Sequence, residues 1–170
     1  MLKLVKPAEA DWAKIDEMMA EWTASGEKIV PYSIRVCNYR DREQYLAVFE
    51  AEEQGIPGFV PATTYFCLDT ERDILVGGVN IRHRLNESLL QDGGHIGDGV
   101  RPSERRRGYA TRMIALALEK CREMGIGRVL MTCSRDNIGS AKGIRKNGGV
   151  LENEISSGGE IVQRYWIDLR

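Results

Sequence analysis

A basic, glycine-containing segment precedes a strongly periodic stretch of the chain and reads Arg105-Arg106-Arg107-Gly108-Tyr109-Ala110-Thr111. Gly108 and Ala110 carry little side-chain bulk, so we expect a ligand to reach the first N–H groups of the helix that begins here. Those unpaired N–H groups and the helix dipole attract anions. The arginines and the Thr111 hydroxyl add charged and neutral donors. The segment therefore predicts a binding site for a diphosphate.

Two common nucleotide-binding loops do not fit this segment. It lacks the G-x-x-x-x-G-K-[ST] spacing and lysine of a Walker A loop, and it is not the G-x-G-x-x-G of a dinucleotide fold. Three arginines in a row, taken alone, are typical of a solvated basic turn. The neighbouring elements decide between that interpretation and an anion site.

The elements on either side of the segment favour the anion site. A strand is predicted over residues 95–100, and Pro102 ends its pairing because proline has no N–H group to donate, which leaves the edge at Val100 free for a ligand amide. After the segment, apolar residues recur at helical spacing as far as Gly125. We expect the loop to join a free strand edge to the N-terminus of an amphipathic helix.

The rest of the chain alternates strands and helices without repeats or linkers, which predicts a single domain over residues 1–170. Alternating or compact apolar runs mark strands, and periodic apolar residues with polar N-caps mark helices. Further strands are predicted at 2–6, 63–69, 74–84, 128–133, 150–155 and 161–169, and helices at 12–26, 41–55, 110–124 and 140–147.

Composition excludes several classes of protein. With 42% hydrophobic and 29% charged residues, the chain is typical of a globular domain. Its 24 basic and 25 acidic residues give no overall attraction to nucleic acid or to an anionic membrane. The four cysteines form no C-x-x-C pair and the two histidines no ligand cluster, so we expect buried reduced thiols and no metal. The N-terminal residues lack the pattern of a signal peptide, which indicates a cytoplasmic protein.

Arg105-x-x-Gly108-x-Ala110 resembles motif A of the GNAT family of N-acetyltransferases, [Q/R]-x-x-G-x-[G/A]. The resemblance extends to the Val100-Arg101-Pro102 strand end and to the order of elements up to the C-terminus. It implies an α/β (α+β) fold with a mixed, twisted sheet of six to seven strands, splayed at its centre and flanked by about four helices. It also implies acetyl-CoA as co-substrate.

The resemblance assigns the CoA-binding residues. The pantetheine arm is expected to pair with Asp98, Gly99 and Val100 like an added strand. The diphosphate is expected on the N–H groups that follow Arg105. A later family element, N-x-x-[A/S], matches Asn137 and Ser140 and implies contact with the CoA arm, although Asn137 equally suits a helix cap. The CoA site implied by the resemblance comprises Asp98, Gly99, Val100, Arg105, Arg106, Arg107, Gly108, Tyr109, Ala110, Thr111, Asn137 and Ser140.

The chain departs from the family pattern where many members carry a tyrosine that protonates the departing thiolate. Here that position is Ile144, and Gly148-Gly149 replaces the usual Gly-Phe. The acid is therefore in doubt but not the fold, because a thiolate with a conjugate acid of pKa near 8.5 is already a fair leaving group.

The amine that attacks the thioester needs a base to take its proton. Asp98 and His95 lie on the strand beside the expected thioester, with side chains on opposite faces. A histidine satisfied within the fold and a solvated carboxylate are the structural alternatives, and His83 ranks below both as a base.

These residues predict transfer of an acetyl group to a primary amine of a small molecule or peptide, by direct attack in a ternary complex. A catalytically reduced acyl-CoA-binding module is the alternative, favoured by Ile144. Residues 27–61 are expected to set the acceptor, and a homodimer stays open as an assembly state.

Overall fold

Seven strands form two antiparallel sheets in the computed structural model, which describes residues 1–170. The first sheet has the order β1-β2-β3-β4, and the second the order β5-β7-β6. The strands are β1 (Leu2–Val5), β2 (Ala62–Asp69), β3 (Ile74–Arg82), β4 (Ile96–Val100), β5 (Arg128–Ser134), β6 (Val150–Ser157) and β7 (Glu160–Asp168).

Five α-helices surround the sheets: α1 (Trp12–Ala24), α2 (Tyr32–Arg35), α3 (Arg42–Gln54), α4 (Tyr109–Glu123) and α5 (Ile138–Lys146). The side chains of Asp11 and Asp41 accept a hydrogen bond from the first turns of α1 and α3, as N-caps do. Short helical turns at 7–9, 89–93 and 102–104 complete the chain. None of the helices combines the length and apolar character needed to cross a membrane.

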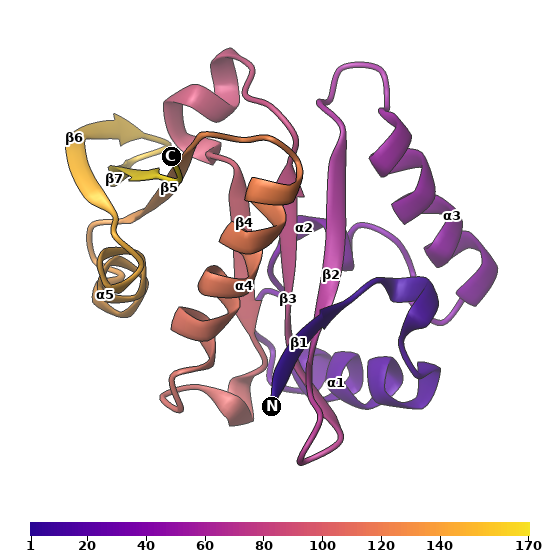
Figure 1. Cartoon of the computed structure of the whole chain (residues 1–170). Helices are drawn as coiled ribbons and strands as arrows, with labels where there is room; N and C mark the ends of the chain where they lie inside the picture. The colour runs from indigo at the N-terminus through magenta and orange to yellow at the C-terminus, as the bar shows by residue number, and fades with distance from the viewer.

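The first sheet is buried on both faces, by different helices. Figure 1 shows α4 lying across β3 and β4, with α5 and the second sheet to one side and α1 and α3 to the other. On the α4 face, Met113 and Ile114 pack with Val79 of β3. The opposite face is covered by α1, α2 and α3, and its core includes Trp22, Tyr45 and Phe66.

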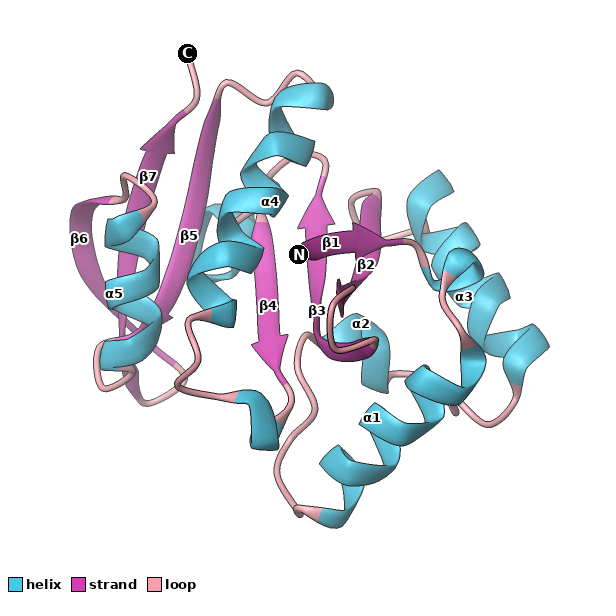
Figure 2. Cartoon of the chain, turned by 60° about the horizontal axis from the view of Figure 1, so that its bottom comes forward, coloured by secondary structure: helices cyan, strands magenta, loops and turns pink.

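The two sheets meet only where β4 and β5 begin. The His95 N–H group donates to the Leu130 carbonyl at 2.8 Å, and no backbone pairing between β4 and β5 follows. The strands run side by side and then diverge towards their C-terminal ends (Figure 2). The predicted splay at the centre of the sheet is therefore present, and it leaves one edge of β4 unpaired.

The sequence predictions agree with this architecture at the level of elements. All seven strands and four of the helices lie where the periodicity places them, within a few residues. The prediction missed α2, a single turn after Pro31 in a stretch without periodicity. It also began α5 at Ser140, whereas the helix starts at Ile138. All four cysteines are free thiols, and three of them are buried.

Candidate active site

The loop before α4 presents a row of backbone N–H groups without acceptors. Arg106 and Gly108 both have positive φ angles, of 62° and 79°, and these conformations turn the chain sharply into the helix. The N–H groups of residues 106–111 donate to no backbone or side-chain acceptor of the chain, and the first intrahelical bond runs from Arg112 to the Gly108 carbonyl at 3.3 Å. Consecutive free N–H groups of this kind bind anions.

Access to these N–H groups is open. A Cβ built on Gly108 would meet no atom within 4 Å, so its position faces solvent. The helix α5 packs beside the same turn, where Asn147 Nδ2 donates to the Thr111 carbonyl at 3.0 Å. The first turn of α4 is thus open in front and supported at the side.

The three arginines of the loop have different partners. The Arg105 guanidinium donates to the Val100 carbonyl at 3.2 Å and forms an ion pair with Glu27, so it braces the loop. Arg107 lies 3.6 Å from Glu104, while Arg106 forms no ion pair. The predicted cluster of phosphate-binding arginines is therefore divided between bracing and free side chains.

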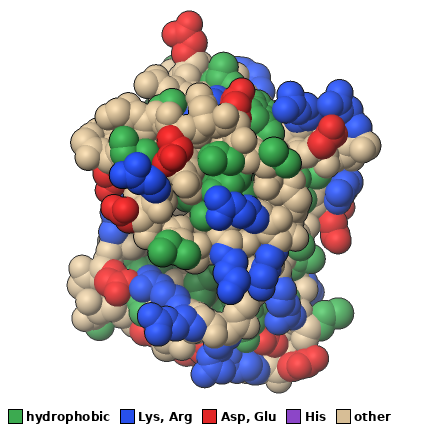
Figure 3. Space-filling view, turned by 90° about the vertical axis from the view of Figure 1, so that its left-hand side faces the viewer, with side chains coloured by type: hydrophobic (Ala, Val, Ile, Leu, Met, Phe, Trp, Pro, Cys, Tyr) green, Lys and Arg blue, Asp and Glu red, His purple; other side chains and the backbone are tan.

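One side of the molecule is nonetheless strongly basic. Figure 3 shows Lys and Arg side chains gathered on the side that carries α5 and the start of α4. Since the whole chain has a formal net charge of −1, this positive region is local. It suits a polyanionic ligand. The exposed basic residues on the loop, at the start of α4 and on α5 are Arg105, Arg106, Arg107, Arg112, Lys142, Arg145 and Lys146.

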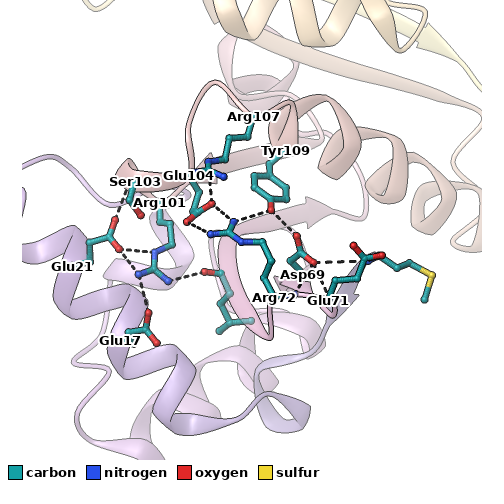
Figure 4. A network of polar contacts seen from close by, with 12 residues as sticks. Glu17, Glu21, Asp69, Glu71, Arg72, Arg101, Ser103, Glu104, Arg107 and Tyr109 are labelled. Carbon is teal, nitrogen blue, oxygen red and sulfur yellow. Dashed lines mark hydrogen bonds and ion pairs between the residues drawn. The ribbon is translucent and has the colours of Figure 1, made fainter.

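A buried polar network holds the loop from behind (Figure 4). Glu104 is 5% exposed and accepts both terminal nitrogens of Arg72, whose hydrogen bond lowers the pKa of the Glu104 carboxyl. The Tyr109 hydroxyl donates to Asp69 Oδ2 at 2.6 Å and accepts from Arg72 at 3.1 Å. Asp69 at the end of β2 and Arg72 in the turn that follows therefore hold Glu104 and Tyr109, which lie on either side of the three arginines.

A second anchor joins the start of the loop to α1. Arg101 is 5% exposed and donates to Glu21 Oε2 at 2.7 Å, to Glu17 at 3.2 Å and to the Leu75 carbonyl at 3.1 Å. The Ser103 N–H group donates to the other oxygen of Glu21 at 3.0 Å (Figure 4). Both ends of the loop are thus positioned before any ligand arrives.

The unpaired edge of β4 carries Asp98 and Val100. The backbone N–H group of Arg82 donates to the His95 carbonyl, and that of Arg101 donates to the Val76 carbonyl. The backbone N–H and carbonyl groups of the odd-numbered residues of β4 therefore face β3. The N–H groups of Asp98 and Val100 consequently point away from β3 into the splay.

Asp98 projects from the face of the sheet that α4 covers, since its register partner Val79 lies in that core. Its carboxylate forms no hydrogen bond or ion pair within the chain, and burial raises its pKa to about 6. Burial raises the pKa of the Cys133 thiol on β5, and the nearby Asp98 carboxylate adds to this rise. Asp98 is therefore an unpaired carboxyl group beside the splay, and its raised pKa makes it a candidate for the base.

His95 links the start of β4 to β5 through hydrogen bonds with Leu130. Its Nδ1 accepts a hydrogen bond from the Leu130 N–H group at 2.9 Å, so the neutral ring carries its proton on Nε2. Burial, with the charge of Arg82, lowers its pKa to about 4. This geometry favours the structural interpretation of His95 over the catalytic one. His83 contacts the Thr63 hydroxyl at 2.8 Å on the far strands of the sheet.

The start of α5 supports one of the two interpretations of Asn137. Its Oδ1 accepts the Ser140 N–H group at 3.1 Å, which is an N-cap, and its amide nitrogen has no partner in the chain. Ser140 lies beside Cys133, and its hydroxyl offsets part of the rise that burial causes in the pKa of that thiol. Ile144 is fully buried in the core and offers no proton donor.

The family model described as an acetyltransferase (GNAT) domain matches residues 2–150. The chain belongs to the GNAT family. The predicted family is thereby confirmed, as are the fold class and the prediction of an acyltransferase. None of the curated protein sequences compared with the chain matches it.

Solved structures of GNAT acetyltransferases share the fold over nearly the whole chain. A ribosomal-protein-S5-alanine acetyltransferase from Vibrio fischeri has a TM-score of 0.69 at 15% identity, over 98% of this chain and 91% of that one. The Campylobacter jejuni N-acetyltransferase PseH, in complex with acetyl coenzyme A, has a TM-score of 0.64 at 13% identity, over 100% of both chains. The spermidine/spermine N-acetyltransferase SpeG from Vibrio cholerae has a TM-score of 0.62 at 14% identity, over 99% of this chain and 93% of that one.

The GNAT motif led to the loop but not to the residues that position it. Sequence analysis missed Arg72, Glu104, Asp69, Arg101 and Glu21. Arg72 and Glu104 lie 32 positions apart, and Glu21 and Arg101 lie 80 apart, so no local spacing signals either pair. In the described residues no group of three or more His, Cys, Asp and Glu side chains is placed to hold a metal ion.

Proposed function

We propose that this GNAT protein transfers an acetyl group from acetyl-CoA to a primary amine of a small molecule or peptide. One observation carries the proposal: the six acceptor-free N–H groups of residues 106–111 lie next to the unpaired edge of β4. The row of N–H groups suits a diphosphate. The unpaired strand edge suits the pantetheine arm of CoA, which contains amide groups and is linked to that diphosphate.

The binding mode follows from this arrangement. The diphosphate binds at the first turn of α4. The basic side chains around α5 form charge-assisted contacts with the remaining phosphate of CoA. The pantetheine arm runs along Asp98, Gly99 and Val100 and accepts and donates hydrogen bonds as a strand does. Asn137 keeps its amide nitrogen free to contact the arm near Ser140.

The chemistry is direct attack of the amine nitrogen on the thioester carbonyl carbon. The arm passes Val100 before it reaches Asp98, so the Asp98 N–H group, which also points into the splay, is placed to stabilise the negative charge that develops on the carbonyl oxygen. Asp98 takes the proton of the attacking amine, directly or through a water molecule. CoA leaves as a thiolate without a tyrosine donor at position 144, because its conjugate acid is already moderately acidic.

The acceptors named for related structures are an alanine of a ribosomal protein and the polyamines spermidine and spermine. They support an amine acceptor and leave its class open.

Calorimetric titration with CoA, followed by a thiol-release assay with acetyl-CoA over a panel of amines, tests the proposal. We expect saturable 1:1 binding and amine-dependent thiol release. Binding without release on any amine or peptide would favour the acyl-CoA-binding module, with buried Ile144 as its structural basis. Absence of CoA binding would overturn both functions.

A further inference from the structure

The splay between β4 and β5 is closed at the end where the two strands begin. The His95 N–H group donates to the Leu130 carbonyl at 2.8 Å, and the Leu130 N–H group donates to His95 Nδ1 at 2.9 Å. A Cβ on Gly94 would lie 2.6 Å from the Leu130 carbonyl oxygen, so the two segments are in contact there. The Thr132 hydroxyl donates to the Asp92 carbonyl at 2.6 Å and ties the next part of β5 to the same turn. The splay is therefore open towards the CoA loop and closed at its other end.

The register of the two strands places two apolar residues just above this closed end. β4 and β5 run in the same direction (Figure 2), so each residue along one strand is matched by a residue along the other. Counting from the contact at the start of the strands, Asp98 lies opposite Cys133. The charge of Asp98 adds to the burial that raises the pKa of the Cys133 thiol, in agreement with this register. Ile96 and Met131 consequently lie between the expected thioester and the closed end.

Side chains fill the closed end on the face that α4 covers. Ile96 and Met131 are 3% and 1% exposed and belong to the core that packs against α4. Protein cores are packed too densely to take up further carbon atoms unless side chains move. An acyl chain that turned towards α4 would therefore meet a wall.

The opposite face of the closed end is covered by Arg82 and Pro31. A Cβ on Gly97 would lie 3.3 Å from Arg82 Nη2 and 3.4 Å from Pro31 Cβ, so both residues lie directly over this part of β4. The Arg82 guanidinium is held in place because it donates to the Gly93 and Gly94 carbonyls, at 3.3 and 3.5 Å. An acyl chain that turned to this face would meet a fixed side chain.

A cavity of about 420 Å³ lies beyond Arg82, between α2, α3 and the first sheet. Its lining is mostly apolar and includes Glu52, Asn80 and Arg82, but no residue of β4 or β5. The Arg82 side chain therefore separates the cavity from the splay. A long acyl chain cannot use this volume while Arg82 keeps its position.

The narrowing of the splay limits the length of the acyl group. Paired strands lie about 4.8 Å apart, so an arm that pairs with β4 needs the next strand at about 10 Å. At the contact between His95 and Leu130 the separation has fallen to about 5 Å, only three residues before Asp98. An alkyl carbon needs about 3.5–4.0 Å to the atoms on each side, so roughly one or two carbon atoms fit beyond the thioester carbonyl.

We propose that the closed end of the splay selects the acyl group of the donor: acetyl and propionyl groups fit it, and butanoyl and longer groups do not. Met131 and Ile96 set the limit on the α4 face, and Arg82 sets it on the opposite face. The proposal rests on the proposed acetyltransferase function and adds the determinants of the acyl donor. Because the CoA loop lies at the other end of the splay, the limit acts on the acyl group and not on the CoA part.

Thiol release from acetyl-, propionyl-, butanoyl- and octanoyl-CoA, with an accepted amine at saturation, tests the limit. We expect kcat/KM for propionyl-CoA within about 10-fold of that for acetyl-CoA. For butanoyl-CoA we expect a value at least about 100-fold lower than for acetyl-CoA, because one methylene group changes kcat/KM by about 10- to 200-fold. Octanoyl-CoA should give no release above the background.

Met131→Ala should relax the limit, because it leaves space on the α4 face. Relative to acetyl-CoA, kcat/KM for butanoyl-CoA should rise at least about 10-fold, while CoA affinity stays that of the wild type. Met113→Ala is the matched control, since Met113 is equally buried in the same core but lies against Gly77 of β3. It should leave the donor preference unchanged. Ile96→Val removes one methyl group at the level of Met131 and provides the test, with a smaller shift in the same direction, if Met131→Ala does not fold.

The outcomes separate the two proposals. If the wild type uses butanoyl- or octanoyl-CoA within about 10-fold of acetyl-CoA, the acyl limit is overturned and the acyltransferase function stands. The limit is also overturned if Met131→Ala folds and shifts the donor preference no more than Met113→Ala does. If the wild type releases thiol from no donor with any amine, the function itself is overturned and the limit with it.

Discussion

Replacing Gly108 with alanine tests whether the backbone of the loop forms the CoA site. Gly108 precedes the first helical residue with a φ angle of 79°, in the left-handed region. Alanine is strained in this region by about 1–2 kcal/mol, because its Cβ approaches the following carbonyl oxygen. A Cβ there meets no protein atom within 4 Å, so the fold can accept the side chain.

The expected loss follows from that strain. If the loop relaxes to escape it, the conformation with outward N–H groups must be regained on binding, and affinity falls by the same 1–2 kcal/mol, about 5- to 30-fold. The Cβ also stands where the diphosphate approaches, which adds to the loss. If the loop keeps its conformation, the strain lowers stability, by roughly 2–8 °C in Tm for a domain of this size, and affinity still falls because the Cβ obstructs the diphosphate.

Gly125 provides a matched control at the other end of α4. It has the same φ angle of 79° and the same open surroundings. Gly125→Ala should therefore lower Tm by a similar amount and leave CoA affinity unchanged. Calorimetric titration with CoA and thermal unfolding of both variants make the comparison. If Gly108→Ala binds CoA within twofold of the wild type, or both variants lose affinity equally, the backbone of this loop is not the binding site.

Three further results are expected. The value of kcat/KM should decrease below a pH of about 6, because Asp98 accepts a proton only as a carboxylate and burial raises its pKa to about 6. Asp98→Asn should lower kcat and remove this pH dependence. An unchanged pH dependence in the variant would contradict the role of Asp98. Glu104→Gln should weaken CoA binding about 10-fold or more by releasing Arg72 from the loop, whereas unaltered affinity would show that the anchor is dispensable. His95→Ala should lower Tm, because the buried Leu130 N–H group loses its acceptor at a cost of about 1–3 kcal/mol. The pH dependence of kcat/KM should stay as in the wild type. If the decrease at low pH disappears in this variant, His95 acts as a base.

Local sequence determined the elements and the place of the loop. Apolar periodicity marked α4, β5 and the hairpins, because one turn or one pleat sets which side chains face the core. Pro102 and Gly108 marked where strand pairing ends and the helix begins, since each restricts or frees a single residue's backbone. The GNAT motif lies in this local part of the chain, and it was sufficient to find the family.

Only the tertiary structure decided how the site is held and what it faces. The ion pair of Arg72 with Glu104 and that of Arg101 with Glu21 join segments that are remote in sequence, and neither pair has a spacing that a pattern can detect. The same holds for His95, whose role depends on where β5 begins, and for Glu52, whose carboxylate faces a cavity because α3 packs on β2. Burial and missing partners set the pKa of such groups, and both arise only when distant segments pack together.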